Sequence, residues 1–104
     1  MSKDKILLAH DVRKQAERLE IDNMQILHKA KEVFAKEEYD SLVEVYKQEE
    51  QDLFLIASLV EKDRIKDAEL LAKNLHTDVR DGYIPGPLAE AFGWKNKGNS
   101  YIIK

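Results

Sequence analysis

The chain has 104 residues, of which 43% are hydrophobic and 36% are charged, and its formal net charge is −3. These values are typical of one globular domain with a modest core and a heavily charged surface, and they exclude a disordered chain. The absence of cysteine excludes disulfide bonds, thiolate zinc sites and cysteine nucleophiles.

The first 81 residues contain neither glycine nor proline. This absence predicts helices, because strand-rich folds of this size need turn residues. We therefore expect an all-α fold, a small helical bundle of four main helices plus a short C-terminal helix, in an up-down or long-hairpin arrangement. Residues 1–94 would form a single helical domain, and residues 95–104 a basic C-terminal tail or arm.

The N-terminal part of the chain carries either two helices or one. We favour a helix over 2–20 and a second over 23–37, because Asp22 followed by Gln25 resembles a capping box. The alternative is one uninterrupted helix over 3–37, whose inward positions alternate spacings of four and three as in a coiled coil. That seam is imperfect, since it includes polar residues such as Asn23.

A third helix is expected to run from a cap at Asp40 to about residue 62. Its segment 53–57 is apolar nearly all round, which is typical of a helix end in a core or under a partner. Glu50 falls on the inward stripe and is a candidate buried carboxylate, which would need a partner or an opening of the bundle. Alternatively, the helix emerges at 48–52 and leaves this run in water.

A fourth helix is expected over 64–80, with Asp63 as its cap. Gly82 would stop this helix, because the residue just past a helix end often needs a positive φ. Its predicted inner face is made of six apolar residues: Ile65, Ala68, Leu71, Ala72, Leu75 and Val79.

The C-terminal part of the chain is richer in turn residues. Pro87 suits the first turn of a short helix over 87–92, and Gly93 ends it. The polar residues at 95–100 predict a connector. The apolar residues 101–103 would then dock on the bundle or form an arm.

Charge is unevenly distributed along the chain. Residues 37–63 hold nine acids against two lysines, a net charge of −7, whereas residues 1–31 carry +2 and the last ten residues carry +3. This pattern favours antiparallel packing of the acidic middle helix against its flanks. Exposed ion pairs add little energy, so charge would set orientation rather than hold the fold.

No residue pattern points to catalysis or to a bound cofactor. The chain has neither a glycine-rich phosphate loop nor a nucleophile elbow. His28 and Glu32 sit four residues apart, a spacing that can bind a metal from one helix face. The same spacing is common in ordinary surface pairs, and we predict no metal site. We also expect no enzyme activity, no cofactor and no small-molecule substrate.

The segment Leu-Ala-Glu-Ala-Phe-Gly-Trp at 88–94 resembles a helix and turn of the helix-turn-helix DNA-binding unit. The resemblance implies a DNA-binding transcriptional regulator that uses residues 64–94. In that unit a recognition helix follows at once, but here the polar run 95–100 follows, and the chain ends soon after. Residues 1–94 also carry −6, which repels phosphate. The sequence therefore disfavours nucleic acid as a partner.

We expect a non-enzymatic protein–protein interaction or regulatory module. Its surface would be the apolar end of the third helix or the late aromatic cluster, since Trp and Tyr often anchor interfaces. The candidate residues are Leu53, Phe54, Ile56, Tyr83, Phe92, Trp94 and Tyr101. The alternative for the aromatic residues is that they plug the open end of the bundle.

The partner would be another protein, or a second copy in a homodimer that completes the core. The apolar run near the N-terminus spans only four residues before His10. That length fits neither a signal peptide nor a membrane span. We therefore expect a cytoplasmic protein with no membrane partner.

Overall fold

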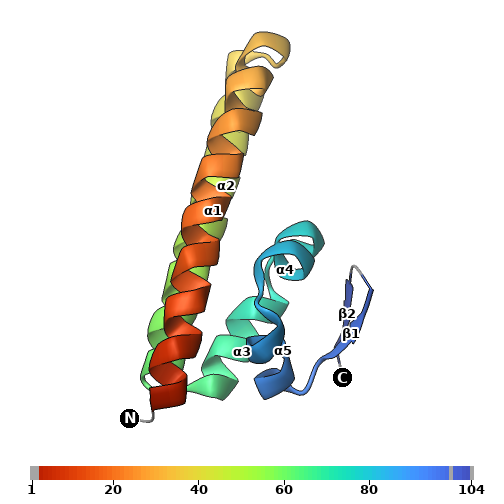
Figure 1. Ribbon diagram of the computed structural model, residues 1–104. Helices are drawn as coiled ribbons and strands as arrows, with labels where there is room; N and C mark the ends of the chain where they lie inside the picture. The colour runs from red at the N-terminus through yellow and green to blue at the C-terminus, as the bar shows by residue number, and fades with distance from the viewer. Residues whose placement is uncertain (1–2, 99, 104) are drawn as a thin grey trace.

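The computed structural model describes residues 3–98 and 100–103, and within them the chain is all-α apart from one small pair of strands (Figure 1). The elements in chain order are α1 (Lys3–Val33), α2 (Lys36–Glu61), α3 (Ile65–Lys73), α4 (Thr77–Tyr83), α5 (Gly86–Phe92), β1 (Lys95–Lys97) and β2 (Ser100–Ile102). The predicted all-α class is confirmed. Two arrangements were predicted, and the long hairpin is the one observed, because α1 and α2 pack side by side in antiparallel directions.

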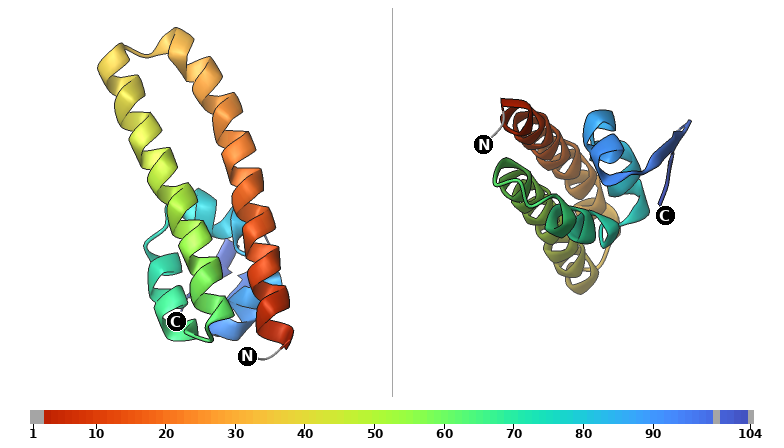
Figure 2. Two further views of the ribbon diagram at one scale, coloured as in Figure 1. Left: turned by 90° about the vertical axis from the view of Figure 1, so that its left-hand side faces the viewer. Right: turned by 90° about the horizontal axis from the view of Figure 1, so that it is seen from below.

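The shorter elements pack against one end of this hairpin only. The molecule measures 46 × 27 × 18 Å, and its long dimension arises because α1 and α2 extend well beyond the other elements (Figure 2). The core lies at the covered end. Its fully or nearly buried side chains come from every helix except α4 and from the short connections: Ala9, Val12, Ala16, Leu19, Leu53, Ile56, Ala57, Val60, Ala68, Ala72, Leu75, Ile84, Leu88, Ala89 and Trp94.

The helix α1 is uninterrupted, so the predicted break at 21–23 is wrong. The two polar residues at the expected break, Asp22 and Asn23, have tertiary partners instead. The carboxylate of Asp22 accepts a hydrogen bond from the hydroxyl of Tyr83, and the amide of Asn23 donates to Glu50 on α2. Because both side chains are satisfied by residues far along the chain, they have no need to compete for backbone groups of α1.

The helix α2 begins earlier than predicted, at Lys36 instead of near Asp40. Ala35 precedes it with extended backbone angles and supplies no side-chain cap. Glu37 and Glu38 lie in the first turn, where carboxylates favour the positive end of the helix dipole. The connection at the tip of the hairpin is therefore very short, and it fixes α1 and α2 as antiparallel neighbours.

The helix α2 ends in a turn that is centred on Asp63, which has a φ of 62°. The amide of Asp63 donates to the carbonyl of Val60, and the amide of Arg64 donates to that of Leu59. This pair of bonds is the Schellman motif, which satisfies the last carbonyls of a helix and usually places glycine at the left-handed position. Asp63 therefore ends α2, and the prediction that it caps the next helix is wrong.

The single helix predicted over 64–80 is divided into α3 and α4. The Nδ1 atom of His76 accepts a hydrogen bond from the backbone N–H of Asp78 at 3.2 Å, which caps the start of α4. Gly82 lies inside α4 rather than past a helix end, and Tyr83 is the last residue of this helix. Ile84 is extended, as the residue before a proline prefers to be.

The helix α5 ends at Phe92 as predicted, and it starts at Gly86, one residue before the predicted start. Pro87 lies in its first turn, and Gly93 follows its last residue with a φ of 82°. The amide of Gly93 donates to Glu90 and that of Trp94 to Ala89, a second Schellman motif.

The C-terminal segment was expected to be a connector followed by an apolar terminus, but residues 95–97 and 100–102 pair as two antiparallel strands, in which Asn96 lies opposite Tyr101. Tyr101 joins this β-hairpin to the helical part of the chain through two hydrogen bonds. Its N–H donates to Asp81 at 3.2 Å, and its hydroxyl donates to the carbonyl of Ile84 at 2.8 Å.

Candidate functional site

The part of the long hairpin that extends beyond the core is the first candidate surface. We define the arm as residues 24–49, the ends of α1 and α2 beyond the hydrogen bond between Asn23 and Glu50. All of these residues are described, and Ala30 alone among them is buried. The arm nevertheless carries five exposed large hydrophobic side chains: Met24, Ile26, Val33, Phe34 and Val45. Single exposed hydrophobic residues are common, but such a density on one uncovered element is typical of a contact surface.

A cleft of about 410 Å³ lies between the arm and α4. We call it the arm cleft, and its lining is formed by Ile26, Leu42, Val45, Tyr46, Glu49, His76, Asp78, Val79 and Tyr83. Leu42, Val45 and Glu49 are spaced three and four apart along α2, so they form one stripe of that helix. Ile26 of α1 and Val79 of α4 supply further apolar lining.

The charged groups in the arm cleft are mainly acidic. Burial raises the pKa of the Glu49 carboxyl, His76 lowers it, and the nearby Asp52 and Asp78 raise it further. The lining includes two carboxylates, Glu49 and Asp78, and none of its nine residues is lysine or arginine. Glu49 is thus a half-buried carboxylate beside other acids, and a cation placed next to it would favour its ionised form.

Arg18 and Asp22 of α1 fix the end of α4 beside the arm. The hydroxyl of Tyr83 donates to Asp22, and the Arg18 guanidinium lies over the Tyr83 ring, 4.3 Å from its centroid. Arg18 also donates to the carbonyl of Gly82 at 2.6 Å. Burial and the Asp22 carboxylate raise the pKa of Tyr83 to about 12. These contacts hold one wall of the arm cleft in place.

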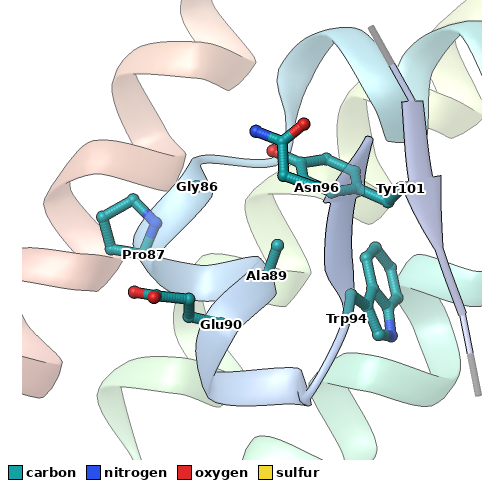
Figure 3. A pocket seen from close by; sticks show the side chains of 7 residues that line it. All are labelled: Gly86, Pro87, Ala89, Glu90, Trp94, Asn96 and Tyr101. Atoms are coloured by element: carbon teal, nitrogen blue, oxygen red, sulfur yellow. The ribbon is translucent and has the colours of Figure 1, made fainter. Parts of the chain in front are cut away.

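A second cavity, of about 270 Å³, lies between α5 and the β-hairpin (Figure 3). Its lining is formed by Gly86, Pro87, Ala89, Glu90, Trp94, Asn96 and Tyr101. The indole N–H of Trp94 already donates to Glu69 at 2.9 Å, and the hydroxyl of Tyr101 donates to Ile84. Because these polar groups are engaged within the fold, they are poorly placed to hold a polar ligand.

The residues predicted as an interaction surface lie mostly inside the molecule. Leu53 and Ile56 have no exposed surface, and Trp94 is only 4% exposed. The other four, Phe54, Tyr83, Phe92 and Tyr101, are half-buried and pack against the core. The rings of Phe92 and Tyr101 lie 5.0 and 5.8 Å from that of Trp94, centroid to centroid. Of the seven, Tyr83 alone lines the arm cleft.

Glu50 is half-buried and accepts a hydrogen bond from the buried Asn23 at 2.8 Å. It marks the point where the core ends and the arm begins. Ile26, Leu42 and Val79 line the arm cleft but were not among the predicted contact residues, and Val79 was expected on the inner face of the fourth helix. Their helical spacing indicated an apolar face, but spacing alone does not reveal that no other helix covers it.

His28 and Glu32 are both exposed on α1. Among the described residues, no group of three or more His, Asp or Glu side chains is arranged to hold a metal ion. No helix within residues 3–98 has the length and apolar character needed to cross a membrane. No family model, curated protein or solved structure matches the chain.

Proposed function

We propose that the chain is a non-enzymatic protein–protein interaction or regulatory module whose contact surface is the arm and the arm cleft. The observation that carries the proposal is the set of exposed apolar side chains on the arm, which α4 approaches only at its base and which the rest of the described chain leaves uncovered. These side chains stabilise the isolated chain little, because burial is the source of hydrophobic stabilisation. A partner that covered them would gain that stabilisation on binding.

The composition of the surface also supports a protein partner. Val45 and Ile26 stand beside polar groups such as Glu49 and His76, and an apolar centre with a polar rim is the usual pattern of an interface. The partner would be another protein or a second copy of the chain. Two arms packed together would form a four-helix arrangement of the kind seen in bundles, and light scattering over a range of concentrations would detect it.

The test is site-specific photo-crosslinking in the cells that produce the protein. A photoreactive residue at Met24 or Val33, both strongly exposed on the arm, should yield a discrete adduct with a protein. Leu70 is a matched control, because it is similarly exposed but lies on α3. The proposal fails if the arm positions give no adduct, or if Leu70 gives the same one.

A DNA-binding regulator that uses residues 64–94 is the alternative, and it has less support. The strand β1 follows Gly93, at the position where a recognition helix would be required. A gel shift with random-sequence duplex DNA at low salt separates the two functions. Salt-sensitive retardation would favour the regulator, and no retardation would remove it.

A further inference from the structure

We infer that the arm cleft receives an amphipathic helix of a partner protein, and that this helix carries lysine or arginine beside its apolar stripe. The inference rests on the proposed function and narrows the partner to one chemical class. It combines the shape of the cleft, its apolar lining and the sign of its charged groups.

The shape of the arm cleft favours a helix over an extended peptide. Its walls are side chains of α1, α2 and α4, so it offers no free strand edge to which an extended peptide could add. The stripe from Leu42 to Glu49 spans about 10 Å at a rise of 1.5 Å per residue, which matches about two turns of a second helix. A groove between packed helices is also the surface into which the ridges of another helix fit.

The apolar lining needs an apolar stripe on that helix. Val45 is 53% exposed and Ile26 is 47% exposed, so both retain surface that a partner could cover. Residues spaced three and four apart on the incoming helix would meet them on one face. The opposite face of the helix would remain in water.

The charge of the arm cleft selects a cationic helix. Glu49 and Asp78 are its charged residues apart from His76, and Asp52 lies close enough to influence Glu49. An acidic or neutral helix would displace water from these carboxylates without offering them a positively charged partner, and burying an unpaired charge costs free energy. A lysine or arginine next to the stripe would pair with Glu49, and its long apolar stem would lie along the cleft.

A second copy of the chain fits this charge pattern less well. The part of α2 within the arm, residues 36–49, holds five acids against two lysines, a net charge of −3. A self-docked arm would bring that acidic helix toward Glu49 and Asp78. The part of α1 within the arm carries only +1, from two lysines and one glutamate over 24–33.

The test uses synthetic peptides and the full chain. The first peptide is an amphipathic helix of about 14 residues, near the shortest length that is helical in water, with a leucine stripe flanked by lysines. The second peptide has glutamates in place of the lysines. The third is the lysine peptide with a proline at its centre, which prevents a continuous helix. Methyl resonances of Ile26, Leu42, Val45 and Val79 report binding at the cleft, and titration gives the dissociation constant.

We expect the lysine peptide to shift these methyl resonances, and the glutamate and proline peptides to bind at least about tenfold more weakly. Glu49→Gln should weaken binding of the lysine peptide about threefold to tenfold. Glu44→Gln is the matched control, because it makes the same charge change on α2 at an exposed position outside the cleft, and it should have little effect. Val45→Glu should weaken binding about tenfold or more. Val45 is half exposed, so this variant should keep the fold, which circular dichroism would verify.

The inference is overturned if the glutamate peptide binds as tightly as the lysine peptide, if Glu44→Gln has the same effect as Glu49→Gln, or if no peptide shifts the cleft resonances. It is also overturned if the chain dimerises and the contacts between copies occupy the cleft. The crosslinking experiment is independent of these outcomes. Adducts from the arm together with a failed peptide test would keep the interaction function and remove the cationic helix.

Discussion

The amide of Asn23 donates to the carboxylate of Glu50 at 2.8 Å and joins α1 to α2 where the core gives way to the arm. On the side of this pair that holds the core, the shorter elements pack against the long hairpin. On the other side, in the arm, Ala30 is the single buried residue. Asn23 is itself only 6% exposed. The hydrogen bond therefore satisfies a buried amide and a half-buried carboxylate at once, and each side chain depends on the other.

The first prediction concerns this dependence. Asn23→Leu or Glu50→Leu alone should lower the free energy of unfolding by about 1–2 kcal/mol, because each leaves a polar group buried without its partner. The double variant should recover most of that loss, since two apolar residues can pack where the pair stood. Urea denaturation of all four proteins gives the coupling free energy. Additive effects of the two single changes would show that the residues do not depend on each other.

The second prediction is that Asp63→Gly stabilises the protein by about 0.5–1 kcal/mol. Asp63 adopts a φ of 62°, and glycine tolerates this left-handed conformation without the steric cost of a Cβ atom. Asp63 contacts Lys5 at 3.7 Å, but the Asp63 side chain is 66% exposed, so this contact should contribute little. Asp63→Asn, which removes the charge but tolerates the conformation, should resemble the wild type. A lower melting temperature for Asp63→Gly in calorimetry would refute the argument.

The third prediction concerns the ionisation of Tyr83. Burial, and then the hydrogen bond and negative charge of Asp22, raise the pKa of Tyr83 from 10.0 to about 12, against the opposing effect of Arg18. Because the folded pKa lies above the ordinary value, the stabilisation is fully present below pH 10 and is lost as the pH rises through about 12.

An alkaline titration followed by tyrosinate absorbance would measure this shift. Tyr83→Phe should remove a transition with a midpoint near 12. Asp22→Asn should move that transition to lower pH. If the transition lost in Tyr83→Phe lies at the ordinary tyrosine pKa, the contact between Tyr83 and Asp22 does not form in solution.

The fourth prediction tests Trp94, which is the single tryptophan of the chain. Trp94→Ala should lower the free energy of unfolding by about 3–5 kcal/mol, because it leaves a large cavity in the core. Trp94→Phe should cost less, since an aromatic ring remains, although Glu69 loses the donor that bonds it at 2.9 Å. Denaturation followed by circular dichroism measures both. Equal losses for the two variants would mean that packing of the ring contributes little.

The candidate site could be predicted from the sequence only in part. The spacing of Val79 and the other apolar residues of 64–80 indicated an apolar helix face, but it placed that face in a bundle interior. Whether such a face is covered depends on where the later elements dock, and α4 reaches only the base of the arm. The acidic character of Glu49 and its neighbours was visible in the charge run over 37–63, whereas their position beside His76 and Val79 was not.

The sequence by itself determined the helical class and several helix ends. The absence of glycine and proline before residue 82 leaves no breaker in α1 and α2, and Pro87 and Gly93 fix α5 because their backbone preferences are local. Tertiary structure decided whether α1 breaks, because Asp22 and Asn23 can either cap a helix or pair with distant side chains. Their partners lie 61 and 27 residues away. Only the folded chain brings Tyr83 and Glu50 to them, and so only the fold sets where the core ends and the arm begins.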